Sequence, residues 1–106
     1  MSMQTDNTYR ALADGTRREI LDCLLEHGPM RATDLAAHFP EISRPAVSRH
    51  VRILREAGLL EERTRGRERW QHVRPLPLQE VQQWVRRYER FWSDKLEDLA
   101  RLVEDD

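Results

Sequence analysis

Cysteine, lysine and long apolar stretches are all scarce in this chain of 106 residues. The single cysteine, Cys23, excludes a disulfide within one chain and a metal cluster of several thiolates. No apolar run is long enough to span a bilayer, and residues 1–10 lack the apolar core of a secretion signal. We therefore expect a cytoplasmic protein without membrane contact.

The net charge of −1 conceals an uneven distribution of charge along the chain. Residues 1–42 carry 4 Arg and 7 acidic residues, residues 43–74 carry 9 Arg and 4 Glu, and residues 75–106 carry 5 basic and 8 acidic residues. The three segments thus have net charges of −3, +5 and −3, which sum to −1. Such a basic central third concentrates positive potential in one place, as a surface that binds a polyanion requires.

The apolar pattern predicts about five helices and a two-stranded β-hairpin in a single domain of residues 1–106, a mainly α (α+β) class. Helices are expected at 8–13, 17–27, 33–39, 43–57 and 78–104, and strands at 59–64 and 68–73. Residues 30–32 form a short segment that can be extended, and Pro75 and Pro77 break the chain before the last helix. Two helices joined by a tight turn and followed by a basic hairpin are the plan of a winged helix-turn-helix.

The predicted helix at 43–57 has an apolar stripe and a polar, basic face opposite it. That face carries Ser43, Arg44, Ser48, Arg49 and Arg52. A helix fits the major groove, where Arg is the commonest side chain that binds guanine N7 and O6. A charged face can also be no more than a solvated surface. The short preceding helix and the hairpin that follows favour DNA recognition here.

The hairpin carries four arginines around a turn at Gly66. Arg65, Gly66 and Arg67 are expected nearest the tip, although the sequence leaves the strand register open. A narrow minor groove has enhanced negative potential and attracts inserted arginines. We therefore predict that this wing contacts DNA, the alternative being a solubilising turn.

Three segments of the chain resemble the ArsR/SmtB family of repressors. They are residues 9–21, Thr-Asp-Leu-Ala at 33–36, and residues 43–60, which begin Ser-Arg-Pro-Ala-Val-Ser-Arg-His. The resemblance covers about residues 8–74, with one small departure at Gly15, where many members have Pro. It implies a winged-helix homodimer that binds a palindromic operator in double-stranded DNA, often its own promoter. It assigns DNA contacts to Ser43, Arg44, Ser48, Arg49 and the wing.

The resemblance does not extend to the metal ligands of the family. Metal-sensing members place a Cys-x-Cys pair just before the Asp-Leu-Ala segment, where this chain has Arg31 and Thr33. Other members use Asp and His on the terminal helix, but residues 75–106 contain no His. His27, His38, His50 and His72 are scattered along the sequence and are predicted to be caps, surface or packing residues. Cys23 is predicted to be a core residue, with any redox role left open. The chain thus resembles a metal-independent branch without a cofactor.

The predicted terminal helix, 78–104, carries more apolar side chains than a domain of this size can cover. We expect it to form a homodimer interface together with the first helix, through Tyr9, Leu12, Trp84, Tyr88, Phe91, Trp92, Leu96 and Leu99. The first turns of the helix are expected to pack on their own domain instead.

Two other classes of function remain as alternatives. A winged helix can serve protein–protein contact, with its basic face incidental. An enzyme is disfavoured because the sequence shows no nucleophile–base pair, phosphate-binding loop or metal triad. The sequence does not identify an effector, which can be a small molecule or a partner protein.

Overall fold

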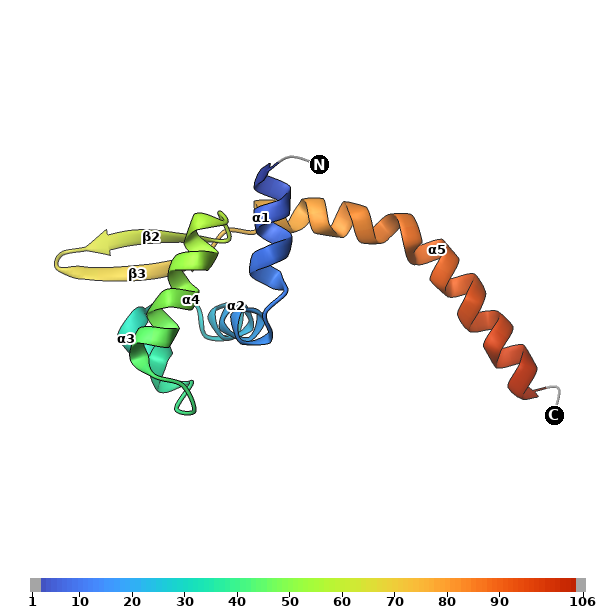
Figure 1. Ribbon diagram of the computed structural model, residues 1–106, viewed down its shortest axis with the longest axis horizontal. Helices are drawn as coiled ribbons and strands as arrows, with labels where there is room; N and C mark the ends of the chain where they lie inside the picture. Colours follow the sequence, from blue (N-terminus) through green and yellow to red (C-terminus); the bar gives the residue numbers. More distant parts are fainter. Residues whose placement is uncertain (1–2, 105–106) are drawn as a thin grey trace.

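The computed structural model describes residues 3–104, so the first two and last two residues of the predicted 1–106 domain lie outside the described part. The elements, in order, are α1 (Met3–Leu12), α2 (Gly15–His27), β1 (Met30–Arg31), α3 (Ala32–Ala37), α4 (Arg44–Glu56), β2 (Leu60–Arg65), β3 (Glu68–Val73) and α5 (Leu76–Glu104). Figure 1 shows a body formed by the first four helices, a hairpin projecting from one side and α5 extending from the other. The mainly α winged helix-turn-helix, with five helices and a hairpin, is confirmed.

Two helices begin at side chains that cap them. Asp14 precedes α2, and its Oδ1 accepts a hydrogen bond of 3.1 Å from the Arg17 backbone N–H. Ser43 precedes α4, and its Oγ accepts one of 3.2 Å from the Ala46 N–H. Each cap satisfies a backbone donor that has no partner within its helix. These caps fix where the two helices start.

The sheet has three antiparallel strands in the order β1-β3-β2. The hairpin was expected, but the pairing of β1 with β3 was not. Met30 lies opposite Gln71, and the Met30 side chain is buried in the core. Burial of Met30 therefore holds this short segment against the free edge of β3, where its backbone groups find partners.

The core lies between α2, α3, α4 and the inner face of the sheet. Its most completely buried apolar side chains are Ile20, Leu35, Val47, Leu54, Leu59 and Leu60. Val47 and Leu54 come from α4 and belong to its predicted apolar stripe. The core thereby fixes which face of α4 points outward.

Helix α5 begins at Leu76, two residues earlier than predicted. Pro77 was expected to break the chain, but it lies in the first turn of the helix, where no intrahelical N–H donor is needed. None of the residues of α5 is buried. The radius of gyration is 18.0 Å, against about 13 Å for a compact domain of this length, because α5 leaves the body. No helix within residues 3–104 combines the length and apolar character needed to cross a membrane.

Candidate nucleic-acid interface

The outward face of α4 carries the five residues predicted to recognise DNA. All of them are exposed: Ser43, Arg44, Ser48, Arg49 and Arg52. Helix α3 packs on α4, and the segment from residue 38 to residue 43 joins the two helices. The packing of α4 on the core leaves the opposite side of the helix open to a partner as large as a duplex.

The arginines of α4 differ in whether an acidic side chain neutralises them. Arg44, Arg49 and Arg52 form no ion pair with any residue in the described part of the chain. Arg55 instead lies 3.4 Å from Glu62 Oε1 on β2 and is half-buried. Arg55 therefore ties α4 to the sheet, whereas the other three guanidinium groups stay free to bind an anion.

A shallow hollow of about 490 Å³ lies between α4 and the start of α2. Arg49 lines it together with Asp14, Arg17 and His50. The Arg17 Nη1 atom is 3.4 Å from His50 Nδ1 and 3.8 Å from Asp14 Oδ2. The backbone hydrogen bond from Arg17, followed by the nearby positive charges, lowers the pKa of Asp14. The acid in this hollow is thus engaged by Arg17, which leaves Arg49 on the rim.

The wing has a two-residue turn, and the structure defines its register. Arg65 lies opposite Glu68, so Gly66 and Arg67 form the turn. Gly66 has φ of 63°, whereas no other residue type within 3–104 has positive φ. A glycine with positive φ at the first turn position is the arrangement of a type II′ hairpin. Arg65, Gly66 and Arg67 are all exposed at the tip.

Trp70 on β3 contacts two arginines, Arg65 near the tip of the wing and Arg31 on β1, a role that the sequence pattern did not predict. The guanidinium carbons of Arg65 and Arg31 each lie 5.9 Å from the centre of its rings. Arg31 also binds Asp34 (Nε–Oδ2, 2.8 Å) and lies 3.5 Å from Glu68 Oε1. The hydrogen bond from Arg31 lowers the pKa of the Asp34 carboxyl. Only the strand register reveals these contacts.

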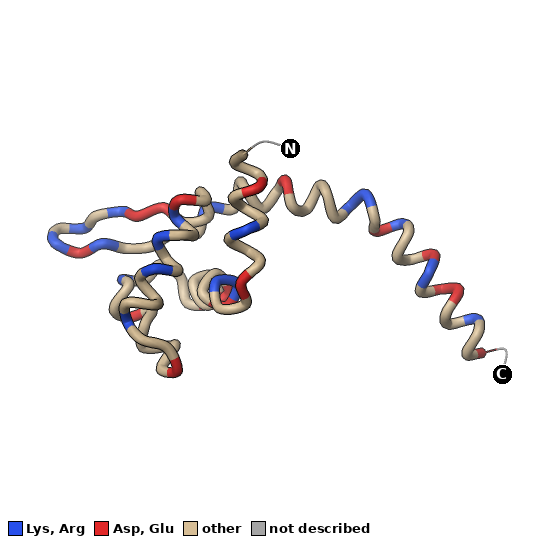
Figure 2. The backbone as a smooth tube through the Cα atoms, in the orientation of Figure 1, with Lys and Arg blue, Asp and Glu red and all other residues tan. Residues whose placement is uncertain are grey.

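The arginines of α4 and of the wing lie on the same side of the body. Figure 2 shows blue segments along α4 and at the tip of the hairpin, on the side of the body away from α5. Because α4 and the wing project from the same core, a single large partner could contact the arginines of both. This surface, formed by the five α4 residues and the wing tip, is called the basic face below.

The residues predicted for a dimer interface lie on α1 and along α5. Tyr9 meets Trp84 edge-on at 6.0 Å, Trp84 meets Tyr88 at 5.3 Å, and Tyr88 stacks on Trp92 at 6.4 Å. The exposed members are Trp84, Tyr88, Phe91, Trp92, Leu96 and Leu99, with exposed fractions between 41% and 65%. Leu12 differs because it packs partly against the core of its own chain. Leu78 also packs there, as expected for the first turns of the helix.

The cysteine and histidine side chains of this chain lie at other places than the metal ligands of the family. The positions of the Cys-x-Cys pair hold Thr33 and Arg31, the latter bound to acidic groups. Two of the histidines, although far apart in the sequence, lie side by side in the structure, which the sequence did not predict. His27 and His38 stack with ring centres 4.9 Å apart, and Cys23 lies beside them. The signal available in the sequence was the spacing of four between Cys23 and His27, which places both on one face of a helix.

Comparison with known proteins agrees with this architecture. A family model described as a helix-turn-helix domain matches residues 12–63. The chain is 38% identical over 99 residues to an HTH-type transcriptional regulator of Mycobacterium tuberculosis, covering 93% of this chain and 88% of the relative. It is 38% identical over 80 residues to the transcriptional repressor SdpR of Bacillus subtilis, covering 76% and 87%.

Solved structures of similar proteins share this fold. An ArsR-like transcriptional regulator from Rhodococcus superposes with a TM-score of 0.70 at 28% identity, covering 93% of this chain and 92% of that one. A homodimeric winged helix-turn-helix DNA-binding domain from Mycobacterium bovis has a TM-score of 0.64 at 24% identity, covering 81% of each chain, and shows the shared fold.

Proposed function

The chain belongs to the ArsR family of winged helix-turn-helix transcriptional regulators, and from this premise we propose that it binds double-stranded DNA as a homodimeric repressor. Its target is a palindromic operator, as the two-fold symmetry of a dimer requires. The relatives named as regulators and as a repressor support this function.

The observation that carries the proposal is the set of unpaired arginines on α4. Arg44, Arg49 and Arg52 are exposed and have no acidic partner among residues 3–104. Contacts to phosphates and base edges need free cations, and the lack of acidic partners leaves these three guanidinium groups available on one helix. The charge of the basic face therefore favours nucleic acid over an undefined protein partner.

The two parts of the basic face have different tasks. Arg44 and Arg49 lie in the first two turns of α4, the part of a recognition helix that reaches base edges. Arg65 and Arg67 lie at the tip of a narrow hairpin and contact the backbone or the minor groove. Helix α4 thus reads the sequence, and the wing positions the protein on the duplex.

The proposed dimer explains the exposed aromatic side chains of α5. Trp84, Tyr88 and Trp92 follow one another along one side of this helix, and large exposed apolar surfaces mark interfaces. The Mycobacterium bovis domain is described as homodimeric, which is consistent with a dimer. Residues 78–104, within α5, would serve as the dimerisation part of the single domain.

The test begins with selection of bound fragments from the source genome, followed by salt titration on the selected duplex and on a scrambled duplex. We expect Arg49→Ala to weaken operator binding by about 1–3 kcal/mol and to relax preference at one base pair per half-site. Arg90→Ala is the matched control, because Arg90 is exposed on α5, outside the basic face. It should leave affinity unchanged.

A different result would favour the protein–protein alternative. If Arg49→Ala and Arg90→Ala bind the selected duplex as tightly as the wild type, α4 does not read DNA. If no fragment is enriched and binding of any duplex is weak at physiological salt, the basic face serves another partner.

A further inference from the structure

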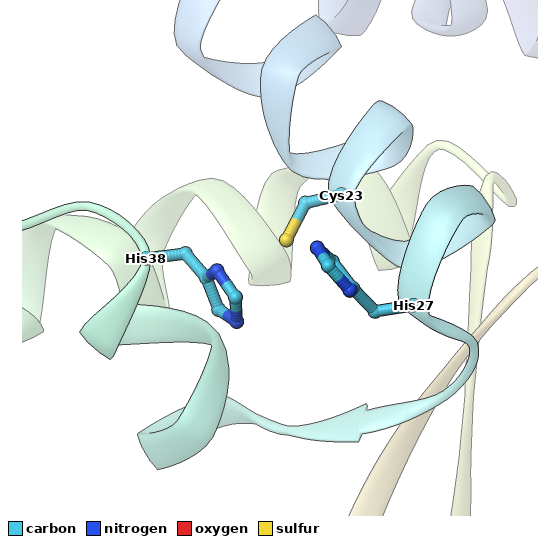
Figure 3. Close-up of side chains that lie close together, drawn as sticks. All are labelled: Cys23, His27 and His38. Carbon is cyan, nitrogen blue, oxygen red and sulfur yellow. The ribbon is translucent and has the colours of Figure 1, made fainter.

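Three metal-ligating side chains meet where α2 ends beside α3. One donor atom each from Cys23, His27 and His38 lies within 4.8 Å of the other two. Figure 3 shows the Cys23 sulfur directed toward the two imidazole rings, which face each other from different elements. This cluster is separate from the basic face and from the aromatic side of α5, which carries Trp84, Tyr88 and Trp92.

Buried neighbours fix the backbone positions of all three residues. Cys23 and His27 lie one turn apart on α2 and therefore share a face. Leu24, next to Cys23, is buried, as is Phe39, next to His38. His38 is the C-cap of α3, and its backbone N–H bonds to the Leu35 carbonyl at 3.0 Å. The cluster is thus built on anchored helix ends, with only its side chains free to adjust.

The distances between the donor atoms suit a small ion with tetrahedral coordination, provided that the side chains move modestly. A zinc ion with one sulfur and two nitrogen ligands separates its ligand atoms by about 3.3–3.6 Å. The donors here lie within 4.8 Å, so they need to approach by about an ångström. Both histidines are exposed, and rotation of their side chains supplies this movement without displacing the backbone.

The chemistry of the donor atoms narrows the choice of metal ion. A thiolate with two imidazoles is a soft-to-borderline set, which favours zinc or copper over magnesium or calcium. The Glu26 carboxylate lies 4.0 Å from His27 Nε2 and adds negative charge beside the cluster. Burial, together with the charge of Glu26, raises the pKa of the Cys23 thiol.

We propose that Cys23, His27 and His38 bind one divalent zinc-class ion per chain, with water as the fourth ligand. Binding forms one metal–sulfur and two metal–nitrogen bonds, and the thiol proton is released to solvent. The ion links α2 to the end of α3, so it stabilises the folded chain. The position differs from that of the Cys-x-Cys pair, which Arg31 and Thr33 replace, and it uses no residue of α5.

The test is titration of the metal-free full chain with Co²⁺, followed by competition with Zn²⁺. We expect a thiolate-to-cobalt charge-transfer band that saturates at about one ion per chain and disappears as zinc replaces cobalt. Cys23→Ser should abolish the band. His27→Gln and His38→Gln should each weaken zinc binding by more than about tenfold, measured against a chromophoric chelator.

A matched control separates this site from adventitious binding. His72→Gln makes the same substitution on β3, outside the cluster, and should bind zinc like the wild type. Circular dichroism of each variant checks that the fold is retained. The proposal is overturned if the wild type gives no charge-transfer band, or if His27→Gln and His38→Gln bind zinc as tightly as His72→Gln.

Discussion

Single polar residues decide where the helices of this molecule start. Asp14 is the clearest case, because its carboxylate accepts from the Arg17 N–H and lies 3.8 Å from the Arg17 guanidinium. Arg17 in turn donates to the Ala11 carbonyl at 2.7 Å and so joins the end of α1 to the start of α2. One carboxylate therefore organises the corner between two helices.

Replacing Asp14 should lower stability by the cost of a helix cap. We expect Asp14→Ala to reduce the free energy of unfolding by about 1 kcal/mol, because one backbone donor of α2 loses its partner. Chemical denaturation at neutral pH measures the change. Asp14→Asn is the control, since its amide oxygen still caps the helix, and a loss as large as that of Asp14→Ala would argue against capping.

The same carboxylate makes stability depend on pH. Its pKa is lowered in the folded chain by the hydrogen bond from Arg17, so its contribution is present above the unfolded pKa of about 3.9. The contribution disappears as pH falls through the folded pKa. The difference in stability between wild type and Asp14→Asn should therefore shrink from pH 6 toward pH 3. The Asp14 side chain is 37% exposed, so screening by solvent keeps the effect small.

Residue type and spacing predicted the basic face but not the clusters formed between elements. Ser43 and Arg49 could be assigned from a helical pattern, because a helix fixes the relation between near neighbours. Trp70 meets Arg31 and Arg65 only through strand pairing, and His38 reaches His27 only through the packing of α3 on the core. Contacts of this kind depend on tertiary structure, which spacing does not specify.

At the scale of elements, the wing joins a rigid base to a charged tip. Six residue pairs connect β2 and β3, from Leu60 with Val73 to Arg65 with Glu68. Only Gly66 and Arg67 lie beyond this ladder. The tip is therefore presented at a defined place relative to α4, as a backbone contact that sets register on DNA requires.

Loss of a wing arginine should act on affinity without changing sequence preference. We expect Arg67→Ala to weaken binding of operator and scrambled duplexes by similar factors. The slope of log affinity against log salt should fall by about one unit for each phosphate that the variant no longer neutralises. Fluorescence anisotropy over a range of salt concentrations gives both quantities.

Arg63→Ala is the control, because Arg63 lies farther from the tip of the wing and its Nη2 atom is 3.3 Å from Glu61 Oε2. A selective loss of operator binding in Arg67→Ala, with scrambled DNA unaffected, would mean that the wing reads bases and would contradict the assigned roles.

Helix α4 begins within one residue of its predicted start, whereas α2 begins at Gly15, two residues before its predicted start. The caps fixed the starts of α2 and α4, whereas β1 depends on an edge provided by β3, about forty residues away in the chain. Pro77 shows a further difficulty, since a proline is compatible both with a break and with the first turn of a helix. The context that decides between them lies in the packing of Leu78 on the core.

At the scale of the whole molecule, one chain leaves a long helix uncovered. Helix α5 contacts α1 near its start, where Glu80 bonds to Thr5, and then extends beyond the body (Figure 1). The sequence predicted that its apolar side chains are not all covered by their own domain, because they exceed what so small a domain can bury. A single sequence does not say which surface covers them.

The dimer proposal leads to a prediction about α5 and its two sides. Trp92 is 49% exposed within the aromatic row, so a charge placed there would enter the centre of the interface and would remain unpaired. We expect the wild type to have the mass of a dimer by light scattering at micromolar concentration, and Trp92→Glu to be monomeric. Arg90→Glu adds a carboxylate to the charged side of the same helix and should remain dimeric.

Because each operator half-site needs one subunit, Trp92→Glu should also bind a full operator no more tightly than a half-site. A monomeric wild type would contradict the proposed interface. So would a Trp92→Glu variant that stays dimeric, because α5 would then be covered by something other than a second copy of its aromatic side.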